Sequence, residues 1–467
     1  MVFPLSTLLP APILAKIGHW AKNKLTVIYY IQWLIVFFYL FLIVVPAFLP
    51  LPLDEIHFYK NLTLFSQFLF WGIWWPFVLL SMVFLGRVWC GVLCPEGTLT
   101  EWASRYGRQG AIPHWIRWRG WPFVAFACTT IYGQLVSVYQ YPKPTLLILG
   151  GSTLAAIVIG FLYGREKRIW CRYLCPVNGV FNLMARLSPL HFKVDHHAWE
   201  KFTYDHKITK KDTPNCAPLI PLRQMEGASE CHMCTRCSGH RDAINLSWRS
   251  SAQEIVNFIN HKDGIWETIL ICFGLIGLAM GAFHWTRSPW FIDLKQYVAV
   301  WLVNHNILWP LDIQTPWWIL TSYSENNDVF NLLDGALIIF YILGTACSVG
   351  FVLLFLIINA IFMIDNFEWK KVYHLSQSLI PLAGCGVFLG LSALTITFLK
   401  LEEIPLFWVS YLRLFFLVTS SLYSLKLGWD ILRFYKISLT RQFFAMTWIG
   451  SAIVYINIGW WLLFWGW

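Results

Sequence analysis

Charged residues are scarce in this sequence: Asp, Glu, Lys and Arg make up only 13% of its 467 residues. Soluble domains carry roughly 25%. A soluble chain of this length would form several domains, and so few charges could not cover their surfaces. The 57% hydrophobic content excludes disorder, a collagen-like fibre and a secreted disulfide scaffold. The composition therefore predicts an all-α polytopic membrane protein.

Signatures of nucleotide binding and hydrolysis are also missing. The sequence has no P-loop or G-x-G-x-x-G fingerprint in a convincing context, no paired acidic residues and no nucleophilic constellation. We therefore expect neither nucleotide chemistry nor ordinary hydrolysis.

Nine apolar runs are long enough to cross about 30 Å of hydrocarbon. With the N-terminus in the cytoplasm, these spans place most of the 35 Lys and Arg on the inner side and the C-terminus outside. The net charge of +10 is thus a topology signal, so we expect contact with membrane lipid and no nucleic acid partner. We expect residues 1–25 to form an N-terminal cytoplasmic or interfacial segment. The runs fall near 26–49, 64–85, 121–140, 145–163, 264–285, 331–363, 372–399, 405–423 and 443–466.

An internal repeat carries four of the 12 cysteines. The string W-C-x-x-L-C-P occurs twice, 81 residues apart, each time after two spans and with a Gly-Arg pair just upstream. Because each copy contains two spans, both motifs face the cytoplasm in a parallel duplication, which we place at residues 26–186. The cysteines of the repeat are Cys90, Cys94, Cys171 and Cys175.

The spacing of these cysteines has a chemical meaning. Both thiols of a roughly helical C-x-x-x-C point the same way, and proline after the second cysteine suits the first turn of a new helix. The positive end of that helix lowers thiol pKa and favours an anionic iron–sulfur cluster. The alternative, buried cysteines at span ends, explains a single motif better than a repeated one. Disulfides are not expected on the reducing cytoplasmic face. Four thiolates therefore predict a [4Fe–4S] cubane.

A third cysteine group lies in the polar loop 187–263. It contains C-x-x-C-x-x-C, the core of a bacterial ferredoxin motif, but Arg241 and Asp242 replace the final cysteine and proline. The nearest spare thiol is Cys216. We therefore predict a second cubane in this cytoplasmic ferredoxin-like loop, held by Cys216, Cys231, Cys234 and Cys237.

Alternatives remain open for this loop. Zinc also binds C-x-x-C pairs, and His232 or His240 could complete such a site. Arg172, Arg236 and Arg241 beside the ligands would favour the reduced, more negative clusters, or they are ordinary solvated charges. The other cysteines lie singly in apolar spans, and we expect small core residues at Cys128, Cys272, Cys347 and Cys385.

The C-terminal half, 264–467, supplies five spans and an outer segment, 286–330, which reads as a membrane-surface cap or a docking site. Haem is not expected, because His284 and His374 fall at opposite faces of the membrane. Polar residues at the cytoplasmic ends of spans are compatible with a quinone pocket, and they are equally ordinary flanking residues. These candidates are Glu267, Lys371, His374, Gln377 and Arg433.

Over residues 26–250 the paired C-x-x-x-C-P strings and the ferredoxin-like segment resemble the NapH, NosR and CcoG-like membrane iron–sulfur proteins. The resemblance implies electron transfer at the bacterial inner membrane, between quinol and a redox enzyme or its maturation machinery. With the two [4Fe–4S] clusters that the cysteine motifs predict, it implies a quinone pool and a redox partner or respiratory complex subunits, and it leaves open a quinol dehydrogenase activity. Members usually carry two complete ferredoxin motifs, whereas this chain has one, which is incomplete.

Two other functions are compatible with these motifs. A CcoG-like assembly factor would use the same clusters to reduce a metal ion for a respiratory oxidase, but no Met- or His-rich outer metal track is evident among the 8 Met. A structural membrane subunit of a respiratory complex would hold the clusters only to stabilise its fold, and the five extra spans fit that function.

Overall fold

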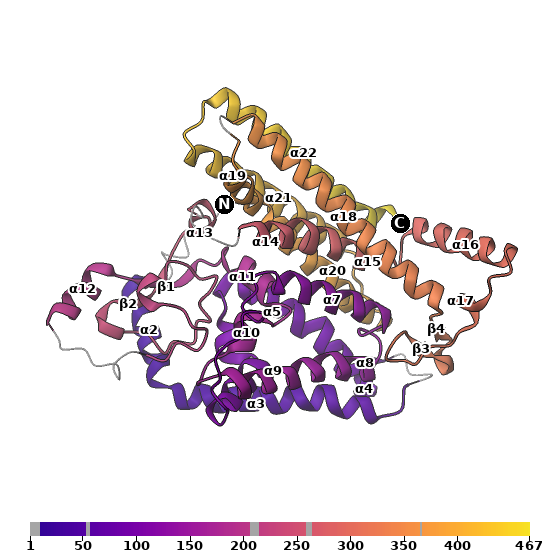
Figure 1. Cartoon of the computed structure of the whole chain (residues 1–467), viewed down its shortest axis with the longest axis horizontal. Coiled ribbons are helices and arrows are strands. Elements are labelled where there is room, and N and C mark those ends of the chain that lie inside the picture. Colours follow the sequence, from indigo (N-terminus) through magenta and orange to yellow (C-terminus); the bar gives the residue numbers. More distant parts are fainter. Residues whose placement is uncertain (1–9, 53–56, 206–213, 258–263, 365–366) are drawn as a thin grey trace. The chain divides into compact units, whose positions relative to one another are not determined.

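The computed structural model describes residues 10–52, 57–205, 214–257, 264–364 and 367–467, and the described chain is mostly helical (Figure 1). The all-α polytopic membrane fold is confirmed. Parts of two predicted segments, 1–25 and 187–263, lie outside the described residues.

The chain forms two compact units that are interleaved along the sequence. Unit 1 combines Met1–Phe41, Val78–Pro122 and Gly151–Asn257. Unit 2 combines Leu42–Phe77, Phe123–Gly150 and Phe258–Trp467. Both units therefore draw on the duplicated region, and all eight predicted cluster cysteines fall in unit 1.

Seven helical stretches of the described chain are long and apolar enough to cross a membrane. The predicted number of nine is not confirmed. Of the two remaining runs, α7 (Trp121–Leu135) has only 15 residues, which span about 22 Å at 1.5 Å per residue. The other, α21 (Val409–Phe434), is long enough but carries four charged side chains. The seven stretches are Leu25–Phe48, Leu62–Leu85, Pro142–Tyr163, Gly264–His284, Leu332–Phe362, Trp369–Leu401 and Leu439–Gly466.

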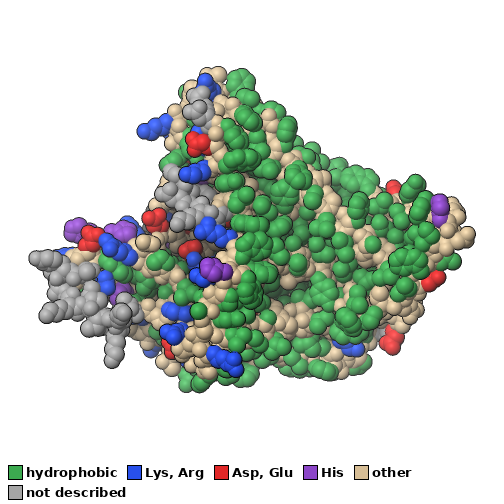
Figure 2. Space-filling view, viewed as in Figure 1, with side chains coloured by type: hydrophobic (Ala, Val, Ile, Leu, Met, Phe, Trp, Pro, Cys, Tyr) green, Lys and Arg blue, Asp and Glu red, His purple; other side chains and the backbone are tan. Residues whose placement is uncertain are grey.

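Helices of unit 2 show why these stretches suit lipid. The 31-residue α18 (Leu332–Phe362) begins at a capping box in which Asn331 and Asp334 satisfy each other's backbone N–H groups. Beyond that start it exposes large apolar side chains such as Phe340, Phe351 and Phe355. Figure 2 shows hydrophobic side chains covering the visible surface of α18 and α22 (Leu439–Trp461). Such a surface is stable only against hydrocarbon or another apolar partner.

In unit 1, two helices of the duplicated region pack closely. Helix α9 (Gly151–Tyr163) carries Gly160 where it crosses α6 (Pro95–Arg105), and a Cβ atom there would overlap the carbonyl oxygen of Thr100. Glycine is therefore required at this crossing, and it holds the two cysteine motifs of unit 1 on a common scaffold. The helices of unit 1 are α2 (Ala11–Asn23), α3 (Leu25–Val44), α5 (Trp75–Leu85), α6, α9, α10 (Ile169–Tyr173), α11 (Asn178–Ala185), α12 (His196–Asp205) and α13 (Gln253–Val256), and of these α3 ends in unit 2 and α5 begins in it.

The polar loop of unit 1 is built on a small antiparallel sheet. Strand β1 (Leu190–Val194) pairs with β2 (Ile244–Trp248) in the register Leu190↔Trp248 to Val194↔Ile244. The amphipathic α2 packs on β2, with Leu14 and Gly18 buried (Figure 1). The sheet thus brackets the chain segment that carries the loop cysteines.

Unit 2 contains the remaining helices and a two-stranded ladder, β3 (Ser322–Tyr323) with β4 (Asp328–Val329). The predicted outer segment forms α16 (Pro289–Asn304) and α17 (Trp309–Asp312), and α16 packs on α18 while exposing Trp290 and Trp301. The other unit 2 helices are α4 (Leu62–Gln67), α7, α8 (Pro142–Thr145), α14 (Gly264–Ile269), α15 (Ala279–His284), α18, α19 (Trp369–Ser376), α20 (Ile380–Leu401), α21 and α22. Short 3-10 or π-helical turns join or interrupt helices in both units: η1 (Val45–Phe48), η2 (Phe58–Lys60), η3 (Phe68–Trp74), η4 (Trp89–Leu93), η5 (Leu146–Gly150), η7 (Leu222–Gln224), η8 (His240–Asp242), η9 (Leu270–Leu278), η10 (Ser324–Asn326), η11 (Gln377–Leu379) and η12 (Leu462–Gly466).

The four single cysteines do not share one environment. Cys272 is buried, as expected for a core residue, and Cys385 is half-buried. Cys128 and Cys347 are exposed, so the expectation of core packing is wrong for them. A small apolar thiol fits a lipid-facing position as well as a core, and the sequence gives no signal that separates the two.

Candidate metal centres

The four cysteines of the repeat lie in unit 1 on two short helical turns. Cys90 is in η4 and Cys171 is in α10, and both are buried. Cys94 and Cys175 follow them by four residues, and all four are free thiols. We call these four residues the repeat set.

The thiols of the repeat set lie close enough to affect one another's pKa. Burial raises the pKa of Cys171 to about 12, and the charge of Cys90 adds to that rise. Burial also raises the pKa of Cys94, with further contributions from Cys171 and Cys90. For Cys175 the causes are burial, then the carboxylate of Glu96, then the neighbouring thiols. Mutual electrostatic repulsion of this kind requires proximity, so the fold brings the four predicted ligands together.

The two copies of the motif differ after the second cysteine. Pro95 is the first residue of α6, as expected, and the Gly97 N–H donates to Cys94 Sγ at 3.4 Å. The same expectation is wrong for Pro176, because α11 begins two residues later, at Asn178. Here the Asn178 N–H donates to the Cys175 carbonyl at 3.0 Å, which closes a turn over the proline.

The four predicted loop ligands line one cavity of unit 1, together with His232 and Arg236. Burial raises the pKa of Cys231 to about 12, and the charges of Cys234 and Cys216 add to it. Cys216 comes from the segment before the C-x-x-C-x-x-C string, as predicted, and reaches the same cavity. We call Cys216, Cys231, Cys234 and Cys237 the loop set.

The polypeptide around the loop set is held by a small hydrophobic core that includes Phe192, Trp199, Cys231 and Cys237. Arg241 stands where a ferredoxin motif would have its last cysteine, and its guanidinium lies over the Trp199 ring at 4.3 Å. The arginine thus fastens the loop to α12. Position 241 therefore serves to hold the loop in place, and Cys216 supplies the fourth thiol instead.

The donor groups around both sets fit an anionic iron–sulfur cluster. Met233 and Thr235 have left-handed backbone, φ 53° and 62°, on either side of Cys234. Alternating backbone of this kind gathers N–H groups into a concavity that suits anions and iron–sulfur clusters. The Met233 N–H also donates to Cys231 Sγ at 3.3 Å, and hydrogen bonds to sulfur are a usual means of tuning such clusters.

The two histidines considered for zinc differ in their surroundings. Burial lowers the pKa of His232, and the nearby arginines lower it further, so the ring is neutral, which is the form that can bind zinc. Within the ranges the structure describes, no group of three or more His, Cys, Asp or Glu side chains is placed around a single ion position. His240 instead stacks edge-on near the Trp199 ring, with 5.5 Å between ring centroids.

The repeat set and the loop set adjoin each other within unit 1. A Cβ atom built on Gly91 would overlap the carbonyl oxygen of His232 and lie 2.9 Å from the backbone nitrogen of Cys234. The residue after Cys90 therefore touches the backbone of the loop set, and only glycine leaves room for this contact.

Three arginines near the ligands were predicted from the sequence, and two others that contact the sets more closely were not. Arg172 pairs with Glu230 at 3.2 Å and Arg236 pairs with Glu101 at 2.6 Å, so both are held in ion pairs. The missed residues are Arg87 and Arg168, both buried between the sets. An exact alignment of the two copies indicates both residues, because the 81-residue spacing matches Arg87 with Arg168, whereas the Gly-Arg pairs match it with Arg165.

The quinone candidates of unit 2 form a partly connected group. Gln377 donates to Glu267 at 3.4 Å, and His374 Nδ1 lies 2.8 Å from the Tyr435 hydroxyl. Lys371 pairs with Glu368 at 3.3 Å, whereas Arg433 is exposed. The two histidines considered for haem both have other neighbours. His374 is hydrogen-bonded to Tyr435, and His284, at the end of α15, packs its ring edge-on against Trp467.

Comparison with known proteins supports the reading of the repeat. A family model described as a 4Fe-4S binding domain matches residues 67–119 and 146–195, which contain all four cysteines of the repeat set. No solved structure matches the chain.

Two curated relatives are similar to this chain. YccM of Escherichia coli (strain K12), whose name proposes a role in electron transport, is 28% identical over 244 residues, covering 46% of this chain and 65% of YccM. NirI of Paracoccus denitrificans (strain Pd 1222) is 33% identical over 133 residues, covering 24% of this chain and 20% of NirI. The chain therefore spans less than two thirds of the length of either relative. Its resemblance to membrane iron–sulfur proteins is confirmed, and residues 67–119 and 146–195 are similar to a 4Fe-4S binding domain.

Proposed function

We propose that this chain is a bacterial inner-membrane protein that relays single electrons between the quinone pool and a redox partner through two [4Fe–4S] clusters. The observation that supports the proposal most is the cavity lined by all four loop cysteines, next to the four repeat cysteines that the 4Fe-4S family model matches. Clusters held there would accept and release one electron at a time. The side chains of the two sets cannot do this reversibly by themselves, so the cofactor would supply the redox chemistry.

The number of two clusters depends on both the comparisons and the geometry. The family match covers the repeat set alone. The loop set lies outside it, and its support is the shared cavity and the left-handed backbone around Cys234. Burial of Cys90, Cys171, Cys231 and Cys237 keeps water from both sets, which protects the sulfurs and lowers the local dielectric constant.

The topology and the partner follow from the same proposal. Both sets would face the cytoplasm, with the N-terminus inside and the C-terminus outside, because that orientation places most Lys and Arg on the cytoplasmic side. The side of unit 1 around α12 exposes charged pairs such as Arg223 with Glu200, at 3.0 Å. A polar surface of this kind suits transient docking of a redox partner or of respiratory complex subunits.

The quinone link rests on the polar group in unit 2. Gln377, His374 and Ser376 are almost fully buried near helix ends, where polar side chains are costly and commonly functional. They would hydrogen-bond a quinone headgroup. Replacing Gln377 with Ala should raise the KM for quinol at unchanged iron content, whereas Arg433→Gln at the exposed candidate should not. Equal KM values in the two variants would remove the quinone from this position.

The decisive experiment measures iron and acid-labile sulfide per chain on protein purified without oxygen, with EPR spectra before and after dithionite. We expect about eight irons and signals from two reduced clusters, as two cubanes require. About four irons would contradict the two-cluster proposal and would favour thiol or metal chemistry at one set.

The metal-reducing assembly factor and the structural subunit remain second candidates, and each has a distinguishing result. An assembly factor would reduce a metal ion in a cluster-dependent assay and would be needed to mature an oxidase. In a structural subunit, loss of the clusters would impair complex assembly without changing electron flow in the complexes that still form. Quinol-dependent reduction of the clusters in the purified chain would argue against both.

A further inference from the structure

Two buried arginines occupy equivalent positions in the repeat. Arg87 stands three residues before Cys90, and Arg168 stands three residues before Cys171. Their exposed fractions are 3% and 1%. A buried guanidinium is costly unless it is fully hydrogen-bonded and faces negative charge, so both positions require compensating partners.

Each arginine binds the opposite copy of the repeat. Arg168 donates to the backbone carbonyl of Cys90 and, at 3.3 Å, to that of Gly91. Arg87 donates to Asn178 Oδ1 in the second copy at 2.7 Å and lies 3.7 Å from Cys90 Sγ in its own. The two guanidinium groups therefore cross-link the halves of the repeat set.

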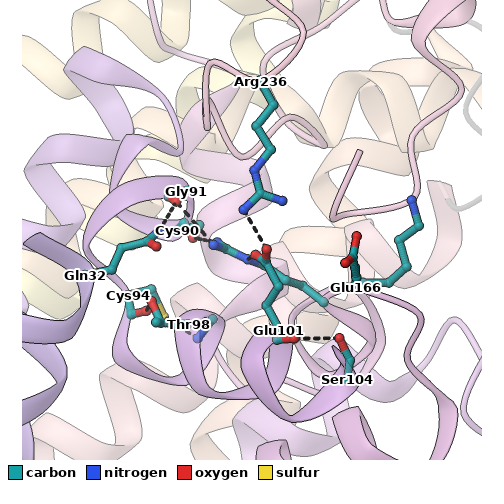
Figure 3. A network of polar contacts seen from close by, with 12 residues as sticks. Gln32, Cys90, Gly91, Cys94, Thr98, Glu101, Ser104, Glu166 and Arg236 are labelled. Atoms are coloured by element: carbon teal, nitrogen blue, oxygen red, sulfur yellow. Dashed lines mark hydrogen bonds and ion pairs between the residues drawn. The ribbon is translucent and has the colours of Figure 1, made fainter. Parts of the chain in front are cut away.

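Each arginine also reaches the segment that carries the loop set. Arg87 donates to the Ser229 carbonyl, two residues before Cys231, at 3.0 Å. Arg168 reaches it through Glu101: Arg168 Nε donates to one carboxylate oxygen at 2.9 Å, and Arg236 donates to the other at 2.6 Å. Figure 3 shows Arg236 pointing at Glu101 beside Cys90 and Gly91.

The charges lie beside both sets, because Arg87 contacts Cys90 Sγ and also the Ser229 carbonyl, two residues before Cys231. Burial raises the pKa of Glu101, but Arg168 and Arg236 outweigh it and hold that pKa below its usual range, so the carboxylate is ionised.

We propose that Arg87 and Arg168 form an arginine bridge that positions both cysteine sets and whose net charge, partly offset by Glu101, sets the reduction potentials of the two clusters together. This inference rests on the proposed function, because it presumes a cluster in each set. Arg87 and Arg168 are positioning residues, and Glu101 adjusts their charge. Placing positive charge in a shared, water-poor region favours the more negative, reduced state of both clusters.

The test is an EPR-monitored redox titration of both clusters in the full chain. Glu101→Gln removes the negative charge while keeping the shape of the side chain, so both midpoint potentials should rise. Arg236→Gln removes a positive charge from the same contact, so both should fall. Arg165→Gln is the matched control: this arginine belongs to the Gly-Arg pair but is exposed, and it should shift neither potential.

The outcomes separate the inference from the function on which it rests. Unchanged potentials in Glu101→Gln and Arg236→Gln at full iron content would overturn the electrostatic role. A shift confined to one cluster would overturn the shared bridge. For positioning, Arg168→Gln should lower the iron content of both sets at once, and loss from only one set would contradict it. A parent protein with about four irons would instead contradict the proposed function itself.

Discussion

The two copies of the cysteine motif are R-V-W-C-G-V-L-C-P and R-I-W-C-R-Y-L-C-P. Each contributes two cysteines, and the copies differ in how they contact the loop. After Cys90 the first copy has Gly91, whose backbone touches His232. After Cys171 the second copy has Arg172, whose long side chain reaches Glu230. One copy approaches the loop by lacking a side chain and the other by extending one. The two copies thus supply four equivalent cysteines. They differ at the residue after the first cysteine, Gly91 or Arg172, and this difference lets each copy contact the loop-set segment in its own way.

The strongest test of the comparison is whether the two copies share one site. Cys90→Ser and Cys171→Ser should each abolish the same EPR signal and lower the iron content from about eight to about four per chain, because a cubane needs all four thiolates. Cys234→Ser should abolish the other signal. Different signals lost in Cys90→Ser and Cys171→Ser would show that the copies do not form a common site.

The glycine contact of the first copy should come next in size. Gly91→Ala adds a methyl group where the His232 carbonyl already lies, so we expect a loss of stability of up to about 3 kcal/mol and loss of iron from the loop set. Thermal unfolding and iron analysis in detergent would measure both. Gly151→Ala is the matched control, since a Cβ there meets nothing within 4 Å, and the added methyl should be neutral or slightly stabilising. Equal behaviour of the two variants would refute the close approach.

The link from the second copy to Arg87 should have an intermediate effect. Asn178→Ala removes the amide oxygen that accepts from the buried Arg87 guanidinium at 2.7 Å. Losing a hydrogen bond to a charged group should cost about 2 kcal/mol of unfolding free energy. Asn178→Asp, which retains an acceptor, should preserve most of that stability. Identical unfolding curves for Asn178→Ala and the parent would show that Arg87 does not depend on the second copy.

The ion pair of the second copy should matter least. Arg172 and Glu230 are 25% and 43% exposed in their side chains, and a solvated pair of this kind contributes below about 1 kcal/mol. Arg172→Gln should therefore leave the iron content intact and shift the unfolding midpoint only slightly, less so at high salt. A loss as large as that of Gly91→Ala would mean that both copies support the loop equally.

Much of the candidate site could be predicted from local patterns. The repeated W-C-x-x-L-C-P string indicated four ligands on one face, and the nearest spare thiol, Cys216, indicated the fourth member of the loop set. Both depend only on residue type and spacing. The helix start at Pro176 was predicted wrongly, because the turn there depends on the Asn178 backbone closing on Cys175.

Composition by itself determined the membrane class, since a chain with 13% charged residues can fold stably only with lipid around it. Residue type and position along the chain were enough to predict which thiols group into sets of four. Only the tertiary structure decided that the two sets adjoin through Gly91 and that Arg87, Arg168 and Glu101 lie between them. The reason is physical: burial and charge pairing depend on segments far apart in the chain coming together, whereas ligand type and spacing are local properties of the sequence.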